Sequence, residues 1–157
     1  GLAKNLKIKP KEASNYIKKY FETYSSVKEY MDANVEFAKK NGYVSTALGR
    51  KRVIKEINSP NFNLRSFGER AAMNMPLQGT SADIIKIAMV NVYNRLKKEC
   101  PDCKLIMQVH DELILDAPIS KQELAGKILK EEMENALKLS VPLTVEVCFG
   151  KNWYEAK

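Results

Sequence analysis

The sequence lacks the features that would place it in a membrane or outside the cell. It has no apolar run near the roughly 18 residues that a membrane-spanning helix needs. Its first residues carry neither the apolar stretch nor the cleavage signature of a signal peptide. Its three cysteines form an odd set, which favours a reduced protein over a disulfide-stapled one. These absences predict a cytoplasmic protein with no membrane partner.

What the sequence does have is a large apolar fraction and an uneven positive charge. Of its 157 residues, 45% are hydrophobic, which is enough for a substantial core. The net charge of +7 arises in residues 1–52, which hold 12 Lys and Arg against 5 Asp and Glu, whereas residues 53–157 hold 14 of each. A basic first third predicts a face that meets a polyanion. A lysine-rich, solvated helix surface is the alternative.

Helical periodicity dominates the first forty residues. A helix is predicted to begin at Pro10, and five large side chains recur along it at helical spacing: Tyr16, Ile17, Tyr20, Phe21 and Tyr24. We interpret this stripe as core packing rather than as a base-stacking surface. Ser26 with Glu29 predicts a capping box for a second helix, which Asn41-Gly42 would end.

The rest of the chain alternates between helices and short strands. The expected elements are a hairpin with a basic tip at 43–54, helices at 64–75, 81–98 and about 118–138, and strands at 105–109, 113–115 and 143–148. Pro76 is expected to end or kink the helix before it, and Ser81 to cap the next one. Helices first, then strands with covering helices, indicate an α+β fold, with helices packed on a small antiparallel sheet.

The strongest candidate for chemistry is His110-Asp111-Glu112, because two adjacent acids lie at the tip of a hairpin whose arms are nearly all apolar. The sequence has no glycine-rich phosphate loop, nucleophile elbow or HExxH motif. The three residues separate two apolar strands, where glycine or asparagine would be usual. Two carboxylates held together repel each other unless a cation lies between them, and hard cations such as Mg²⁺ take oxygen ligands. An ordinary polar turn is the alternative, and a lone histidine is more often structural than a metal ligand.

A second candidate is a set of hydrogen-bond donors at a spacing of four residues, Arg70, Asn74 and Gln78. On one helix face they would suit the minor-groove acceptors that every base pair presents in similar places. A polar helix face that binds water is the alternative.

Two further motifs are weaker. Arg50-Lys51-Arg52 is a plausible phosphate contact but also a common solvated turn. The single CxxC at Cys100 and Cys103 could form a zinc site only with His110 and Cys148 from distant segments. A thioredoxin-type role expects the motif to enter a helix, whereas here it leaves one.

Longer motifs make the chain resemble family A DNA polymerases, the bacterial DNA polymerase I group. Gln108-Val109-His110-Asp111-Glu112 is similar to the third palm motif of that family, and the run from Glu69 to Asp83 is similar to the helices before it. Gly42-Tyr43-Val44 with Gly49-Arg50-Lys51-Arg52 resembles the family's connection between fingers and palm. Val141-Pro142-Leu143 and Gly150-Lys151-Asn152-Trp153 resemble its end. The similarity covers essentially all 157 residues in order.

The resemblance implies the C-terminal part of a right-hand polymerase domain. Residues 1–62 would be fingers-side helices with the basic hairpin, and residues 63–157 the C-terminal palm. The fingers helix that holds the incoming nucleotide, and the first palm motif with its metal-binding aspartate, would lie before Gly1. Apolar faces that pack on those parts would then be exposed, so the isolated chain is expected to self-associate.

The resemblance also implies roles for single residues. Asp111 would bind the divalent metals, taken as Mg²⁺, of a two-metal site completed by an aspartate absent from this chain. Glu112 would be its acidic neighbour, and His110 would lie at the primer terminus. Three residues would contact primer-template DNA in the minor groove: Arg70, Asn74 and Gln78. Arg50 would contact the DNA backbone, and the cysteine pair has no counterpart.

The implied function is template-directed DNA synthesis, in which a deoxynucleotide passes from dNTP to a primer 3′-hydroxyl by two-metal catalysis. The alternative is a non-catalytic nucleic-acid-binding module of the same fold, which the charge of residues 1–52 would also suit. A zinc or redox protein is a third possibility, which an elemental assay of the purified chain would test.

We predict that the isolated 157-residue chain does not extend a primer. Cations roughly 3.5–4 Å apart need carboxylates from more than one segment, and this chain supplies one such segment. Primer extension with Mg²⁺ and the purified chain would measure this, and incorporation above a protein-free control would contradict it.

Overall fold

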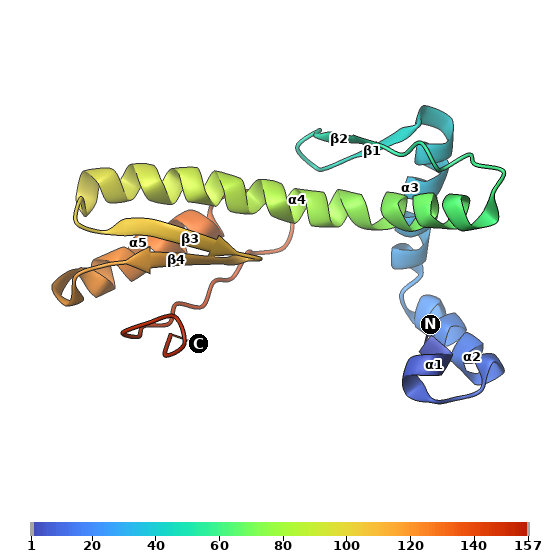
Figure 1. The fold of residues 1–157 in the computed structure, drawn as a ribbon, viewed down its shortest axis with the longest axis horizontal. Helices are drawn as coiled ribbons and strands as arrows, with labels where there is room; N and C mark the ends of the chain where they lie inside the picture. The colour runs from blue at the N-terminus through green and yellow to red at the C-terminus, as the bar shows by residue number, and fades with distance from the viewer. Residues whose placement is uncertain (1, 157) are drawn as a thin grey trace. The chain divides into compact units, whose positions relative to one another are not determined.

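The computed structural model describes residues 2–156, which form two compact units, residues 2–76 and 77–156 (Figure 1). The described residues form helices and two separate two-stranded antiparallel sheets, and the predicted α+β class is confirmed. Within residues 2–156, no helix is both long enough and apolar enough to cross a membrane.

The first unit contains three helices, a hairpin and the start of a fourth helix. Its elements are α1 (Leu2–Leu6), α2 (Pro10–Thr23), α3 (Ser25–Asn41), β1 (Tyr43–Ser45), β2 (Lys51–Val53) and the first part of α4 (Phe62–Glu99). The predicted hairpin is confirmed, with Val44 paired to Arg52. Helix α3 ends at Gly42, whose φ of 78° lets its N–H donate to the Ala38 carbonyl at 2.7 Å.

The core of the first unit lies where α3, the hairpin and α4 meet. Six buried residues form it: Ala38, Val44, Ile54, Ile57, Ala72 and Met75. Two polar contacts join the same elements. The Asn58 amide donates to the Lys39 carbonyl at 3.1 Å, and the Lys39 ammonium lies 3.6 Å from the Glu69 carboxylate. The first contact holds the loop after the hairpin against α3, and the second joins α3 to α4.

Helix α2 begins at Pro10 as predicted, but its aromatic stripe does not pack into a core. Tyr16, Tyr20 and Tyr24 are each about half exposed, and Ala13 is the one buried residue in the helix. The rings contact each other instead, with the Tyr20 and Tyr24 centroids 5.0 Å apart. Periodicity places residues on one helix face but does not say what covers that face, so the core-packing interpretation is wrong for the described chain.

The predicted capping box at the start of α3 is also wrong. The helix begins at Ser25, with Tyr24 at the cap position and no side-chain hydrogen bond to the helix start. Because α2 ends at Thr23, one residue separates the two helices. Ser26 is therefore already inside α3, where its side chain cannot act as an N-cap.

Helix α4 contradicts the predicted break at Pro76, because it runs without interruption over 38 residues. A proline inside a helix has no N–H to donate and costs about 3 kcal/mol. Buried side chains lie on both sides of it: Ala72 and Met75 belong to one core, and Ala88, Val92 and Leu96 belong to the other. This packing outweighs the local propensity of Pro76, Gly79 and Ser81 for a break.

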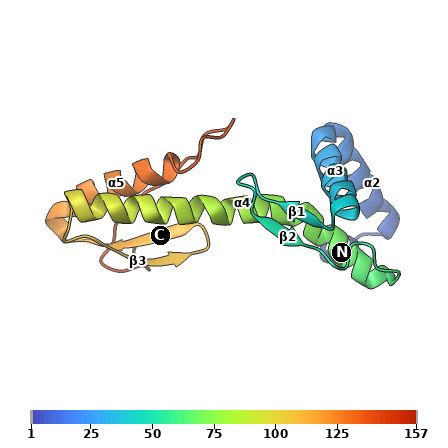
Figure 2. The same cartoon turned by 90° about the horizontal axis from the view of Figure 1, so that it is seen from above.

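The second unit builds a hairpin and a helix onto the rest of α4. It contains β3 (Lys104–Val109), β4 (Glu112–Asp116), the 3₁₀ turn η1 (Ile119–Lys121) and α5 (Gln122–Glu134). The hairpin and α5 lie along this part of α4 (Figures 1 and 2). Their shared core includes Val92 and Leu96 of α4, Leu113 of β4 and Ile128 of α5.

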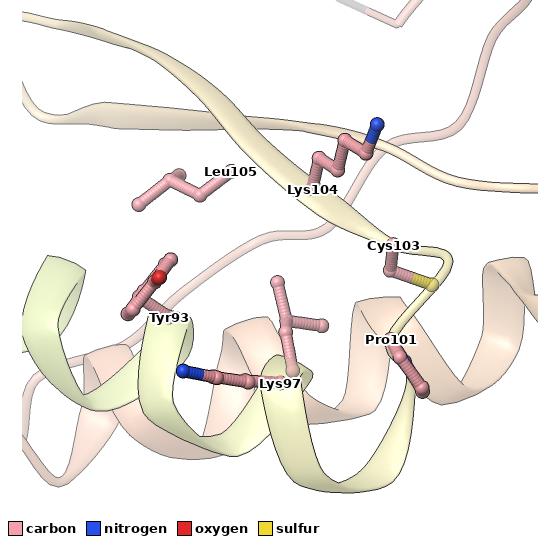
Figure 3. Close-up of a pocket in the computed structure, with 7 residues that line it drawn as sticks. Tyr93, Lys97, Pro101, Cys103, Lys104 and Leu105 are labelled. Carbon is pink, nitrogen blue, oxygen red and sulfur yellow. The ribbon is translucent and has the colours of Figure 1, made fainter.

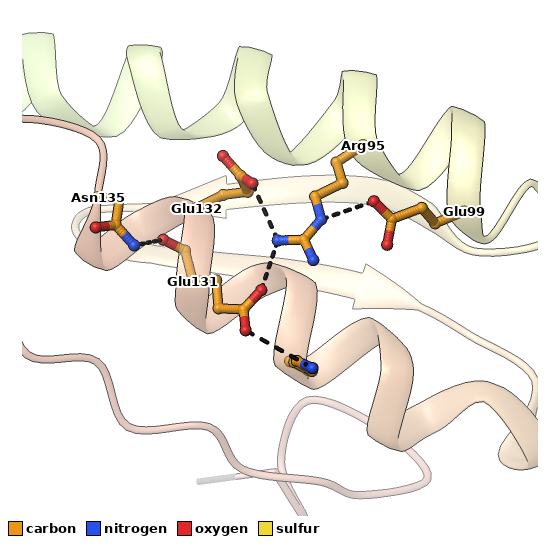
Figure 4. Close-up of polar contacts among 6 residues, drawn as sticks. Arg95, Glu99, Glu131, Glu132 and Asn135 are labelled. Atoms are coloured by element: carbon orange, nitrogen blue, oxygen red, sulfur yellow. Dashed lines mark hydrogen bonds and ion pairs between the residues drawn. The ribbon is translucent and has the colours of Figure 1, made fainter.

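An ionic cluster ties α4 to α5 beside this core (Figure 4). The Arg95 guanidinium contacts Glu99 at 2.9 Å on its own helix, and Glu131 at 2.6 Å and Glu132 at 3.1 Å on α5. Hydrogen bonds to Glu99, then to Glu131 and Glu132, raise the pKa of Arg95 above its ordinary value. One planar guanidinium thus bridges both helices, as its five donors allow.

The predicted strand at 143–148 does not form. The Val145 N–H donates to the Glu134 carboxylate at 3.0 Å, so this backbone bonds to a side chain at the end of α5 and not to a strand. Helix α5 also ends at Glu134, before the expected residue 138. An apolar run alone cannot specify a strand, because a strand also needs an edge to pair with.

We predict that Gly68→Ala lowers the stability of the first unit. A Cβ at this position would lie 2.9 Å from the Ile57 backbone nitrogen. Alanine gains about 1 kcal/mol of helix propensity, but overpacking against rigid backbone costs about 1–3 kcal/mol. The expected result is a lower thermal midpoint by circular dichroism. The matched control is Ser81→Ala at an exposed position of α4, and a midpoint raised equally in both variants would contradict the prediction.

Candidate active site

The site is centred on the turn between β3 and β4. Val109 pairs with Glu112, so His110 and Asp111 alone reverse the chain. His110 has a φ of 53°, as two-residue hairpin turns require, and histidine enters this region more readily than most residues. The Gln108 side-chain amide donates to the His110 carbonyl. We expected both acids in the connection, but Glu112 is the first residue of β4.

The turn presents its polar side chains to solvent and anchors the hairpin through one apolar neighbour. His110, Asp111 and Glu112 are all exposed, whereas Leu113 is buried in the core of the second unit. Because strand side chains alternate, Glu112 points away from the face that buries Leu113. The two acids therefore lie at one end of the hairpin, and the packing of Leu113 in the core fixes the hairpin in place.

A tryptophan from the end of the chain reaches this turn. The Trp153 indole Nε1–H donates to Glu112 Oε2 at 3.3 Å. The sequence did not predict this contact, because 41 residues separate Trp153 from Glu112. The run Gly150-Lys151-Asn152-Trp153 indicated only a resemblance to the end of the family's sequences. The one available signal was that the chain's only tryptophan follows a glycine and an asparagine, which favour a turn.

The predicted DNA-contacting residues fall in both units. Arg50, Arg70 and Asn74 belong to residues 2–76, whereas Gln78 belongs with the His-Asp-Glu turn to residues 77–156. All four side chains are exposed. Arg70 and Asn74 lie four residues apart on α4, and so on one helix face. The Arg70 guanidinium donates to Ser66 Oγ at 2.8 Å, one turn before it.

Arg50 lies in the β1–β2 connection, directly before the first residue of β2. Its N–H donates to the Thr46 hydroxyl at 3.1 Å, and the Thr46 N–H donates to the Arg50 carbonyl at 2.9 Å. Gly49 before it adopts a φ of 82°, which favours glycine. The backbone at Arg50 is therefore well held, and its exposed side chain leaves the hairpin at a defined point.

Metal ligands are few in the part of the chain that the structure describes. No group of three His, Cys, Asp or Glu side chains there is arranged to hold an ion. Asp111 offers exposed carboxylate oxygens, the donors that hard divalent cations prefer, whereas the Glu112 carboxylate already accepts the Trp153 N–H. The turn fits one part of a cation site.

The prediction of reduced cysteines is wrong for one pair. Cys100 and Cys103 are joined by a disulfide and both are buried, while Cys148 is free and exposed. The two sulfurs cannot act as thiolate ligands while bonded to each other, so the structure does not assemble the zinc site that the CxxC motif suggested. Three residues of separation at the turn after α4 bring their Cα atoms to 5.4 Å, a usual disulfide spacing.

A cavity of about 400 Å³ lies at the other end of β3 (Figure 3). Its lining includes Tyr93 and Lys97 of α4, Pro101 of the turn, and Lys104 and Leu105 of β3. The cavity lies at the Lys104 end of β3, whereas the His-Asp-Glu turn follows the Val109 end. The cavity is therefore separate from the carboxylates of Asp111 and Glu112.

Comparisons with known proteins agree on one family. A family model described as DNA polymerase family A matches residues 1–155. The chain is 54% identical over 157 residues to DNA polymerase I of Caldicellulosiruptor bescii and 49% identical to that of Bacillus subtilis. In each case the match covers 100% of this chain and 18% of the relative, so the chain spans about a fifth of their length.

A solved structure is similar over nearly the whole chain. The POL domain of Pol1 from M. smegmatis, in complex with DNA primer-template and dNTP, matches with a TM-score of 0.96 and 42% identity. The match covers 99% of this chain and 28% of that one.

We predict that the turn tolerates His110→Gly but not His110→Val. At the φ of 53°, a β-branched side chain adds strain of about 1–2 kcal/mol, whereas glycine adopts this region freely. Urea unfolding should show the valine variant to be clearly less stable than the glycine variant. Met107→Val, in the extended strand before the turn, is the control and should be nearly neutral. Equal stability of the two His110 variants would show that the turn lacks this backbone conformation.

Proposed function

This chain belongs to DNA polymerase family A, and from that premise we propose that it forms the C-terminal part of a polymerase domain for template-directed DNA synthesis. In this reaction the primer 3′-oxygen forms a bond to the α-phosphorus of a dNTP. The bond from that phosphorus to the bridging oxygen breaks, and pyrophosphate leaves. The observation that carries the proposal is the pair of exposed acids on a tight hairpin turn, within a chain that matches the family over residues 1–155.

Asp111 is the residue that we assign to the metals. Its carboxylate is exposed at the turn and is held there by a paired hairpin, so a cation and a phosphate oxygen could both approach it. Bound Mg²⁺ would supply Lewis-acid stabilisation of the phosphate oxygens and a lower pKa for the attacking hydroxyl. A second carboxylate segment would come from another part of the polymerase. Glu112 would be the acidic neighbour of Asp111 near the metals and would have a lesser role.

The hydrogen-bond donors on α4 support a DNA-binding role. Arg70, Asn74 and Gln78 would contact minor-groove acceptors of the primer-template, which lie at similar places in every base pair. Such contacts test the shape of a base pair without reading its sequence. Although Arg70 donates to Ser66, a guanidinium has five N–H donors. His110 would lie at the primer terminus, and Arg50 would contact a backbone phosphate.

The charge distribution fits a division of labour within the chain. Residues 1–62, which hold the basic excess, would be the fingers side, and residues 63–157 would be the C-terminal palm with the metal-binding turn. The positive charge would favour approach to DNA phosphates. A cytoplasmic location at the nucleoid follows from this role. Self-association of the isolated chain stays a prediction, to which the exposed aromatic stripe of α2 gives a physical reason.

The second candidate function is a nucleic-acid-binding module that does no chemistry. The excess of Lys and Arg in residues 1–52 supports it, because that charge alone would bind a polyanion without any carboxylate. The two candidates differ in what Asp111 does, so a variant at that position separates them.

We predict that Asp111→Ala abolishes primer extension in a polymerase of the relatives' length that carries this chain. Losing a metal-binding carboxylate should lower the extension rate by roughly 10²-fold or more, while DNA affinity stays almost unchanged. Single-turnover extension and fluorescence anisotropy would measure the two quantities.

Asp102→Ala is the matched control, because Asp102 is an exposed aspartate in the turn at the other end of β3. It should leave both quantities unchanged. Extension that survives Asp111→Ala would overturn the catalytic assignment, and weakened DNA binding with normal extension would favour the binding module.

A further inference from the structure

The segment before the C-terminal turn packs on α5 through Val147 and Phe149. Gly126 of α5 allows this approach, because a Cβ there would lie 2.8 Å from the Phe149 ring and 3.2 Å from the Val147 side chain. Glu134 at the end of the helix accepts the Val145 N–H at 3.0 Å. The segment that leads to the C-terminal turn is therefore attached to α5 at two separate places.

The turn that follows is closed by its own side chains. The Asn152 amide donates to Glu155 Oε1 at 2.9 Å, and the Glu155 N–H donates to Asn152 Oδ1 at 3.1 Å. Glu155 Oε2 also accepts the Lys151 N–H at 3.1 Å. Gly150 has no room for a side chain, since a Cβ would lie 2.6 Å from the Ala156 backbone nitrogen. These contacts fix the backbone on both sides of Trp153.

From this geometry we propose that Trp153 is a positioning residue that holds the Glu112 carboxylate beside the Asp111 turn. Its indole N–H donates to Glu112 Oε2 at 3.3 Å. An indole has a single donor and accepts nothing, so it fixes a carboxylate oxygen without competing for a cation. The Trp153 side chain is 40% exposed, so the rest of its surface packs against the protein.

In the proposed function, Trp153 would separate the roles of the two neighbouring carboxylates. Asp111 and Glu112 repel each other, and a free glutamate has three rotatable bonds through which it could swing toward a cation at Asp111. A hydrogen bond from Trp153 keeps one oxygen of Glu112 in place and stabilises its charge. Asp111 is then the carboxylate that remains available at the turn. This inference rests on the proposed function for its catalytic meaning, but the contact itself does not.

The contact can be tested in the 157-residue chain, because Trp153 is its only tryptophan. The N–H bending band of an indole in ultraviolet resonance Raman spectra reports the strength of its hydrogen bond, whatever the association state of the protein. We expect Glu112→Gln to weaken the bond and shift this band. Asp111→Asn removes the same charge one residue away and should leave the band unchanged.

A variant that touches neither partner gives a second test. Gly150→Ala should displace the turn, because of the 2.6 Å approach to Ala156, and should shift the band as Glu112→Gln does. If Glu112→Gln leaves the band unchanged, or if Asp111→Asn shifts it equally, the proposed contact is wrong.

The catalytic consequence is tested in a polymerase of the relatives' length that carries this chain. Trp153→Phe keeps the ring but removes the donor, and we expect it to lower kcat by about three- to tenfold while the KM for dNTP and the affinity for DNA stay unchanged. In a Glu112→Gln background the same substitution should cause little further loss.

Equal losses in both backgrounds would show that Trp153 acts through the fold and not through Glu112. An inactive parent enzyme would count against the proposed function, while the Raman result would still decide the contact.

Discussion

Antiparallel pairing places Val109 opposite Glu112, so two residues alone are available to reverse the chain between β3 and β4. A shift of one residue in the pairing would turn Leu113 from the core toward solvent. The free energy lost by exposing this side chain disfavours the shifted register. The same register puts Asp111 in the turn and Glu112 on the strand. Two adjacent acids thus acquire different surroundings from one backbone constraint.

The hairpin in turn depends on the layer beneath it. Helix α4 and helix α5 supply most of the core on which Leu113 rests, and Arg95 joins them through carboxylates of both helices. The C-terminal segment uses the same helix α5 through Gly126 and Glu134. Since Trp153 lies at the end of that segment, the partner of Glu112 is placed by packing that starts far from the turn.

The proposed polymerase function would give these local features a common purpose. A two-metal centre needs carboxylates from more than one segment, and in the proposed function this chain would contribute one turn with one available acid. Its basic residues and the hydrogen-bond donors on α4 would contact DNA, whose phosphates and minor-groove edges vary little with sequence. Under this proposal, the metal-binding carboxylate and the DNA contacts would lie on different elements of the chain.

Local chemistry in the sequence was enough for several elements and for the family. Pro10 marks the start of α2, Gly42 ends α3, and both hairpins lie where short strand-like runs separated by turn residues predicted them. The His-Asp-Glu turn was found because acids are unusual between two apolar strands. The roles of Asp111 and of the donors Arg70, Asn74 and Gln78 stay predictions.

Other features were decided by contacts that no short stretch of sequence contains. Helix α4 continues through Pro76 because cores on both sides of it bury its side chains. The run at 143–148 forms no strand, and its Val145 N–H donates to the Glu134 side chain of α5. The aromatic stripe of α2 is exposed because periodicity defines a face but not its cover. Trp153 meets Glu112 across 41 residues. Tertiary packing alone brings such distant groups together, because it depends on all the surfaces that meet in the folded chain.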